Sequence, residues 1–267
     1  MATTRTAGPL KRNIAEDYLS GNTTLRPFYR HSLQNPDFAA IREAKLFPDE
    51  RRKALCEVLE AQYADLPAIE AVRESLAKLA RPETFSITTG HQLNIMGGPL
   101  YTPFKVLNVA KLAARLSQED PAHPVVPIFW IHTEDHDFEE IDHYYTGFGQ
   151  KKHYKGHFGT ATGHHILDES ISSLVPSHFG EPGKAYRPGR SLAEATLRFA
   201  HELYGPYGVI VLNADHPALK ALFRPVIERE LFERFSEKAV LEQKRSSFSR
   251  RLRHAGKSEG DQPVLAG

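Results

Sequence analysis

The chain has 267 residues and a mass of 30.0 kDa, which corresponds to one large domain or two small ones. Hydrophobic residues make up 40% and charged residues 25%, as in an average soluble globular protein, so wholesale disorder is excluded. The 34 Lys and Arg residues nearly balance the 33 Asp and Glu residues. With a net charge of +1, no global field steers the protein toward nucleic acid or an anionic membrane.

The cysteine content and the hydropathy of the sequence exclude further classes of protein. The single cysteine, Cys56, excludes an intramolecular disulfide framework and a cysteine-based zinc cluster. No apolar run reaches the ~18 residues of a membrane span. The first residues, Met1-Ala-Thr-Thr-Arg-Thr-Ala-Gly, lack the apolar region of a secretory signal. We therefore expect a cytoplasmic protein that binds neither nucleic acid nor membrane.

The first part of the chain is predicted to be helical. From about Asp49 to Leu79, apolar residues recur at spacings of three and four, which indicates an amphipathic helical segment interrupted at Pro67. Cys56 falls inside this pattern, where a packing role is expected. We interpret residues 1–80 as an N-terminal helical segment packed on the core.

The remainder predicts an α/β fold. Runs rich in apolar and β-branched residues predict strands at 85–90, 124–131 and 208–212, and helices are predicted at about 100–116, 191–203 and from His216 onward. Strand, loop and helix occur three times, which is typical of an open parallel sheet with flanking helices. We assign this core to residues 81–215 and a long helix to 216–250. Because ligands bind at the carboxyl ends of such strands, the residues after each strand are the functional candidates.

A glycine-rich loop follows the first strand. Its glycines permit positive φ and close backbone approach, and N–H groups at the start of the next helix can hold an anion. The spacing matches neither the dinucleotide fingerprint nor a P-loop. The candidate binding residues are Gly90, His91, Gln92, Asn94, Gly97, Gly98, Tyr101 and Lys105.

A cluster of acidic residues and histidines follows the second strand, from His132 to His143. A short helix is predicted there, with Phe138 and Ile141 facing the core and Glu139 and Asp142 facing solvent. Trp130, just before the cluster, is expected in the core. The candidate catalytic residues are Glu134, Asp135, His136 and Asp137. We expect them and the glycine loop to line opposite walls of one cleft.

Two chemistries fit this cluster: acid–base work or ammonium binding by carboxylates, and metal binding by His and carboxylate ligands. The metal reading has less support, because no H-E-x-x-H motif occurs and Glu140-x-x-His143 lacks a second copy. No metal site is assigned, and none is assigned among the histidines of residues 150–180. After the third strand, Asp215 is expected to cap the following helix.

These motifs resemble a known family. Thr88-Thr-Gly-His-Gln, Gly98-Pro-Leu-Tyr-Thr with Lys105, and the run from Val126 to His143 are similar to the bacillithiol-biosynthesis cysteine-adding enzymes (BshC). The resemblance covers roughly residues 10–248 and implies a Rossmann-like core joined to a C-terminal coiled coil, through which full-length members would form homodimers. It also implies the last step of bacillithiol synthesis, in which the cysteine carboxyl is joined to the amine of glucosaminyl-malate. The cofactor is unassigned: amide formation needs coupling, for which ATP is the natural guess, but no familiar ATP motif is present.

The chain departs from this family at its end, because members continue to about twice its length. The apolar period stops after Ser249, and residues 251–267 are expected to form an aberrant or disordered tail. Read one frame over, the segment Glu-Gly-Asp-Gln-Pro-Val-Leu-Ala can spell Arg-Glu-Ile-Asn-Leu-Phe-Trp, and a similar stretch belongs to the family downstream. We hypothesise a frameshifted, truncated member. The alternatives are a metal-assisted hydrolase or transferase that uses His132, Glu134, His136 and His143, and an inactive ligand-binding fragment.

Overall fold

The computed structural model describes residues 13–45, 47–146, 149–156 and 160–244, and the chain divides into two compact units, 1–48 and 49–267. The first unit contains α1 (Ile14–Leu19), a 3₁₀-helix (Thr23–Phe28) and α2 (Phe38–Glu43). Asn13 and Asp37 cap α1 and α2, because their side chains accept backbone N–H bonds from Ala15 and Ala40.

The second unit begins with two helices, α3 (Asp49–Tyr63) and α4 (Glu70–Leu79). The predicted interruption of the helical pattern at Pro67 lies between them. Both helices contact the sheet or its flanking helices, so residues that the sequence pattern grouped with the N-terminal segment belong to the same compact unit as the sheet. Cys56 is half-buried and packs at the edge of the core, as expected for a packing residue.

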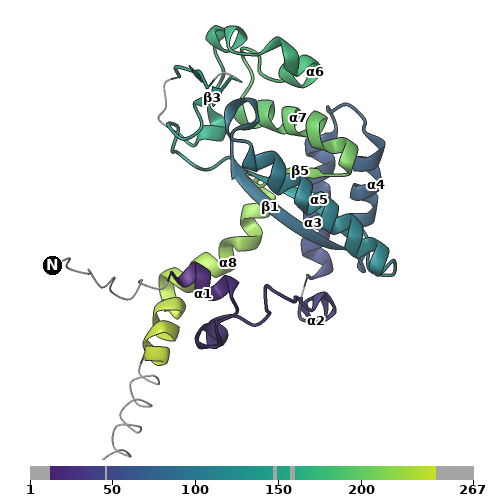
Figure 1. The fold of residues 1–267 in the computed structure, drawn as a ribbon, viewed down its shortest axis with the longest axis vertical. Coiled ribbons are helices and arrows are strands. Elements are labelled where there is room, and N and C mark those ends of the chain that lie inside the picture. The colour runs from purple at the N-terminus through teal and green to yellow at the C-terminus, as the bar shows by residue number, and fades with distance from the viewer. Residues whose placement is uncertain (1–12, 46, 147–148, 157–159, 245–267) are drawn as a thin grey trace, which may run out of the picture. The chain divides into compact units, whose positions relative to one another are not determined.

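Three parallel strands form the central sheet in the order β1 (Phe85–Gln92), β2 (Val125–His132) and β5 (Ile210–Asn213). They confirm the three predicted strands. Figure 1 shows α5 (Tyr101–Glu119) lying across this sheet, with α7 (Leu192–Tyr204) beside it. The predicted α/β fold, a Rossmann-like parallel sheet with flanking helices, is confirmed.

Burial on both faces of β2 explains its continuous apolar sequence. Phe129 and Ile131 pack in one buried cluster with residues of α5 and α7, whereas Val126 and Ile128 pack in a second cluster with residues of α3 and α4. Alternate residues of a strand point to opposite faces, so a strand covered on both sides must be apolar throughout. Each fully buried aliphatic side chain contributes roughly 1.5–3 kcal/mol.

The segment after β2 is not helical, so the short helix predicted there is wrong. Residues 133–142 form turns, because Asp135 accepts the backbone N–H of Asp137 at 3.0 Å and Asp137 accepts that of Glu140 at 3.3 Å. Aspartate side chains that bind nearby N–H groups in this way compete with helix hydrogen bonding. Phe138 and Ile141 are nevertheless buried, as predicted.

A loop-rich region connects these turns to α7. It contains the antiparallel pair β3 (His143–Tyr145) and β4 (Lys151–His153) and the short helix α6 (Gly180–Gly183). It also contains 3₁₀-helices at Thr162–His164, Glu169–Ser173 and Ser177–Phe179, and two further ones lie at Ile95–Gly97 and Gly205–Tyr207.

The last described helix, α8 (Pro217–Glu233), begins where expected, but its N-cap is His216, so the predicted capping role of Asp215 is wrong. The helix ends at Arg234, which adopts left-handed backbone angles, and residues 235–244 are helical again. The predicted single helix over 216–250 is therefore broken. The expected tail at 251–267 lies outside the described residues, and the coiled coil stays a prediction. In the part of the chain that the structure describes, no helix is long and apolar enough to cross a membrane.

Candidate functional site

The carboxyl ends of the three strands meet at one edge of the sheet. In the strand register Gln92 is opposite His132, and Ile131 is opposite Asn213. The segments that follow β1, β2 and β5 therefore start side by side, which is the arrangement in which open α/β sheets bind ligands.

The side chains of His91 and Gln92, the last two residues of β1, contact different groups. The His91 ring packs against the Tyr101 ring of α5, with centroids 5.0 Å apart. The Gln92 amide instead faces the Asp135 carboxylate. The two side chains also touch each other, with His91 Nδ1 2.9 Å from Gln92 Oε1, so Gln92 links the two groups.

A cavity of about 790 Å³ lies on the His91 side. The candidate binding residues that line it are His91, Asn94, Gly97, Gly98 and Tyr101. Aromatic side chains from distant parts of the sequence complete the wall: Tyr144, Tyr145, Phe179, Tyr204 and Tyr207. None of Glu134, Asp135, His136 and Asp137 is among its lining residues. The two predicted segments thus meet where Gln92 faces Asp135, but they are not opposite walls of this cavity.

Two buried acceptor atoms in the cavity wall have no hydrogen-bond partner among the described residues: His91 Nε2 and Asn94 Oδ1. The residues are only 3% and 8% exposed. His91 Nδ1 lies 2.9 Å from Gln92 Oε1, and Asn94 Nδ2 donates to the Glu140 carbonyl at 3.1 Å. Each orphaned buried acceptor costs roughly 1–3 kcal/mol, so a ligand that donates hydrogen bonds would be favoured here.

Burial, followed by the nearby Lys105 ammonium, lowers the pKa of His91. Both effects disfavour a second ring proton. A neutral ring that donates from Nδ1 to the Gln92 Oε1 keeps the lone pair of Nε2 available. The electrostatics therefore agree with the geometry in making His91 Nε2 an acceptor.

The glycine loop adopts backbone angles that side chains disfavour. Gly97 and Gly98 have φ of 88° and 70°, and a Cβ at Gly98 would lie 2.6 Å from Asn94 Cβ. The loop leads into α5, whose first turn has no side-chain cap. Few backbone donors remain for an anion there, because the Thr102 N–H donates to the Pro99 carbonyl at 2.9 Å and Pro103, in the same first turn, has no N–H.

Lys105, which was predicted as a ligand donor, is bound to the protein itself. Its ammonium donates to the Gly90 carbonyl at 2.6 Å and lies 5.7 Å from the centre of the Tyr101 ring. Tyr101 and Lys105 therefore lie on one face of α5. These contacts fasten the start of α5 to the end of β1.

The acidic cluster after β2 lies on the Gln92 side of the edge. Backbone N–H donation from Asp137 is the main cause that lowers the pKa of Asp135, and Gln92 adds to the effect. Asp135 is therefore ionised at neutral pH. Glu134, His136 and Asp137 are exposed, and His136 Nδ1 lies 3.3 Å from the Glu134 carbonyl.

Sequence reasoning missed two polar side chains at this edge of the sheet, Lys220 and His164. Lys220, one turn into α8, lies 2.7 Å from Glu134 Oε1 and also pairs with Asp215. His164 Nε2 lies 2.6 Å from the other Asp215 oxygen. Lys220 is the main cause that lowers the pKa of Asp215, and Asp215 in turn raises the pKa of Lys220. The one sequence feature that pointed to these contacts is the position of Asp215 shortly after β5.

Two further predictions are wrong. Trp130 is 45% exposed rather than in the core, because its register partner Gly90 offers no side chain to pack against; its ring contacts His132 instead. Asp142 was expected on a solvated face, but its side chain is only 17% exposed and contacts two histidines.

The proposed metal set of His132, Glu134, His136 and His143 is not assembled within the described residues. Glu134 pairs with Lys220, and His143 instead lies beside Asp142. Among the residues that the structure describes, His143 alone of these four belongs to a group with metal-ligand spacing.

A parallel sheet covered by helices on both faces, with polar residues at its carboxyl edge, defines a Rossmann-like α/β domain. The sequence model of the family described as "Bacillithiol biosynthesis BshC, N-terminal Rossmann-like domain" matches residues 1–258, and the chain belongs to this family.

Curated relatives carry the name "Putative cysteine ligase BshC". That of Cytophaga hutchinsonii is 38% identical over 244 residues, covering 88% of this chain and 45% of the relative. That of Solibacter usitatus is 42% identical over 220 residues, covering 75% and 40%. That of Flavobacterium johnsoniae is 32% identical over 244 residues, covering 86% and 46%. The chain thus spans about half the length of the curated relatives it matches.

Proposed function

We propose that this chain is the N-terminal part of a ligase that joins the carboxyl group of cysteine to the amine of glucosaminyl-malate, the last step of bacillithiol biosynthesis. The family match over residues 1–258 carries this proposal. The partners are small molecules in the cytoplasm, and homodimerisation through a coiled coil is expected of full-length relatives.

In this proposal the cavity beside the glycine loop receives glucosaminyl-malate. Sugar hydroxyls donate to His91 Nε2 and Asn94 Oδ1, the buried acceptors without a partner among the described residues. The aromatic wall contacts the apolar faces of the sugar ring. The malate group lies beside the loop Gly97–Gly98, where Tyr101 at the start of α5 also lines the cavity.

The residues after β2 hold the substrate amine where it reaches past Gln92 to Asp135, and one of them accepts its proton. A protonated amine has no lone pair with which to attack a carboxyl carbon, so a base is required. The lowered pKa of Asp135 suits it to bind the ammonium rather than to take its proton. We assign proton transfer to His136, because it is the exposed imidazole beside these carboxylates and an imidazole can act as a general base. Glu134 and Asp137 add negative charge, and Gln92 is a positioning residue for Asp135.

Mass spectrometry tests the proposal. The full chain is incubated with cysteine and glucosaminyl-malate, with and without ATP, and the mass of the condensed product is sought. Asp135→Asn and His136→Ala are expected to lower product formation by about 100-fold or more, as loss of a general base does. The control, Glu139→Ala, removes an exposed carboxylate of the same segment and should leave the rate unchanged.

If this half-length chain forms no product, the same substitutions are made at the matching positions of the full-length Cytophaga relative. Wild-type activity of both variants there would refute the assigned roles. Calorimetry then examines the half-length chain itself. Binding of glucosaminyl-malate that His91→Ala weakens, without product, would identify a ligand-binding fragment.

A further inference from the structure

Two histidines lie directly opposite each other in the β3–β4 ladder. His143 pairs with His153 in the antiparallel register. The backbone bonds Tyr154 N–H to the Asp142 carbonyl (2.7 Å) and Thr146 N–H to the Gln150 carbonyl (2.9 Å) fix the alternation of the ladder. They make His143 and His153 a non-hydrogen-bonded pair, the kind in which opposite side chains approach most closely. The ring centroids are 5.4 Å apart.

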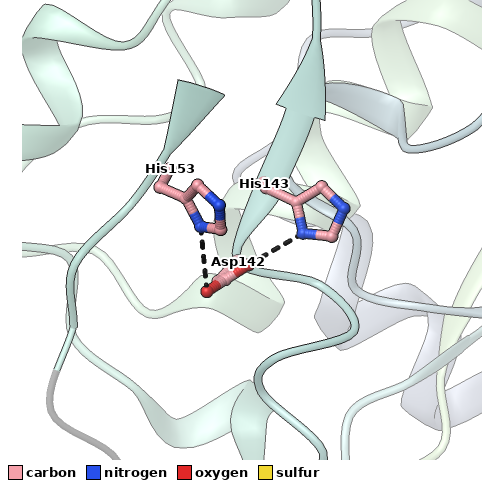
Figure 2. Close-up of side chains that lie close together, drawn as sticks. All are labelled: Asp142, His143 and His153. Carbon is pink, nitrogen blue, oxygen red and sulfur yellow. Dashed lines mark hydrogen bonds and ion pairs between the residues drawn. The ribbon is translucent and has the colours of Figure 1, made fainter. Parts of the chain in front are cut away.

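The carboxylate of Asp142 lies beside both rings, as Figure 2 shows. Its Oδ1 is 2.8 Å from His143 Nδ1 and its Oδ2 is 3.3 Å from His153 Nδ1. One ligand atom from each of the three side chains lies within 4.8 Å of the others. Two imidazoles and one carboxylate therefore converge on a single small volume.

The backbone around this cluster is held by buried neighbours. Asp142 is flanked by Ile141 and bonded to Tyr154, and both of these are only 1% exposed. Ile141 in turn accepts the backbone N–H of Ile95 at 3.2 Å, beside the glycine loop. His153 is 44% exposed, so an ion from solvent can reach the cluster. The three ligand side chains are therefore attached to a backbone that buried neighbours hold in place, and an ion from solvent can still reach them.

We propose that Asp142, His143 and His153 form a binding site for a divalent transition-metal ion of the zinc class. Zinc takes imidazole nitrogens at about 2.0–2.1 Å and carboxylate oxygens at about 2.0–2.2 Å, and two such nitrogens with one oxygen are a frequent set of protein ligands. The ion replaces the two hydrogen bonds between the carboxylate and the rings. A ring that binds the ion through Nδ1 carries its remaining proton on Nε2.

Three protein ligands leave one tetrahedral position open for water or a small ligand. His143 also lines the cavity that His91 and Asn94 line. The ion would therefore sit at the wall of the candidate ligand cavity. The metal site is inferred from the positions of the three ligand side chains alone. It does not depend on the proposed ligase activity, so the failure of one proposal leaves the other unaffected.

Metal titration of the tag-free full chain tests the site. After chelator treatment and dialysis, Zn²⁺ is titrated in competition with a chromophoric chelator, and Co²⁺ absorption reports the coordination. We expect one zinc ion per chain, with Mg²⁺ a poor competitor because it prefers oxygen ligands. His143→Ala and His153→Ala should each raise the Kd by about 10- to 100-fold or more. Asp142→Asn keeps the shape of the side chain but removes its negative charge, so it should also raise the Kd for zinc.

The matched control is His123→Ala. His123 Nδ1 lies 2.9 Å from Asp120 Oδ2, a His–Asp pair of similar geometry outside the metal-spaced group, and its removal should leave zinc affinity unchanged. Thermal unfolding gives a second readout, since an ion that binds only the folded chain raises the Tm of the wild type but not of the ligand variants. The proposal is refuted if the wild-type chain binds no zinc, or if His143→Ala and His153→Ala bind it as tightly as the wild type.

Discussion

The hydroxyl of Tyr63, at the end of α3, accepts the backbone N–H of Val211 at 2.6 Å and lies 3.3 Å from the Val211 carbonyl. Gln62 makes the same kind of double contact with Asn213. Because β5 is the last strand of the sheet formed by the described residues, no further strand among them pairs with its outer backbone groups. Two adjacent side chains of α3 therefore satisfy the open edge and hold α3 in register with the strand that leads to the site.

We predict that Tyr63→Phe destabilises the protein by roughly 1–3 kcal/mol, because a buried backbone N–H loses its partner. Chemical denaturation followed by circular dichroism measures the change. Tyr207→Phe, at a tyrosine that is 61% exposed, is the control and should be nearly neutral. Equal stability of the two variants would mean that the hydroxyl does not support the edge.

Gly98→Ala should distort the glycine loop. The added Cβ would lie 2.6 Å from Asn94 Cβ at a φ of 70°, so both strain and a clash are expected, together costing roughly 1–3 kcal/mol. The displaced Asn94 should also weaken ligand binding in the cavity. Gly189→Ala provides the control, since that glycine has a φ of 79° but nothing within 4 Å of the added atom. Calorimetry should find weaker glucosaminyl-malate binding in the first variant alone.

Stability below neutral pH should depend on His91. Its pKa in the folded protein is lower than the usual 6.5, so the unfolded chain takes up a proton more readily than the folded one. The wild type therefore loses stability as the pH falls through and below 6.5. His91→Asn keeps a donor for Gln92 but does not titrate, so its urea midpoint should fall less over this range. Parallel pH profiles of the two proteins would contradict the assignment.

Lys220→Met should raise the pKa of Asp215 toward its usual 3.8, because the lysine is the main cause of the lowered value. A carboxylate with a lowered folded pKa stabilises the protein above 3.8, and that stabilisation is lost as the pH falls through the folded value. The variant should thus be less sensitive to acid below pH 3.8. NMR titration of Asp215 measures the shift directly. Arg224→Met, one turn further along α8 and paired with Glu228, should leave Asp215 unchanged.

Local patterns in the sequence were sufficient to predict most of the secondary structure. The strand Val125–His132 is a continuous apolar run because both of its faces are buried, and helices α4, α5 and α7 repeat apolar residues every three or four positions because one side of each packs on the sheet. The helix predicted after Asp135 failed for a local reason as well, since Asp135 and Asp137 bind backbone N–H groups that a helix would have used.

The motifs that follow the three strands were expected at one edge of the sheet, and they start there, because parallel strands bring their carboxyl ends together whatever their separation in sequence. Which side chains meet there was decided by tertiary structure alone. His164 reaches Asp215, and Lys220 reaches Glu134, across long intervals of chain that carry no periodic signal. The sequence by itself was sufficient to predict the fold, the family resemblance and the segments of the candidate site. The grouping of the charged side chains followed only from the tertiary structure, because strand register and loop packing decide which distant segments meet.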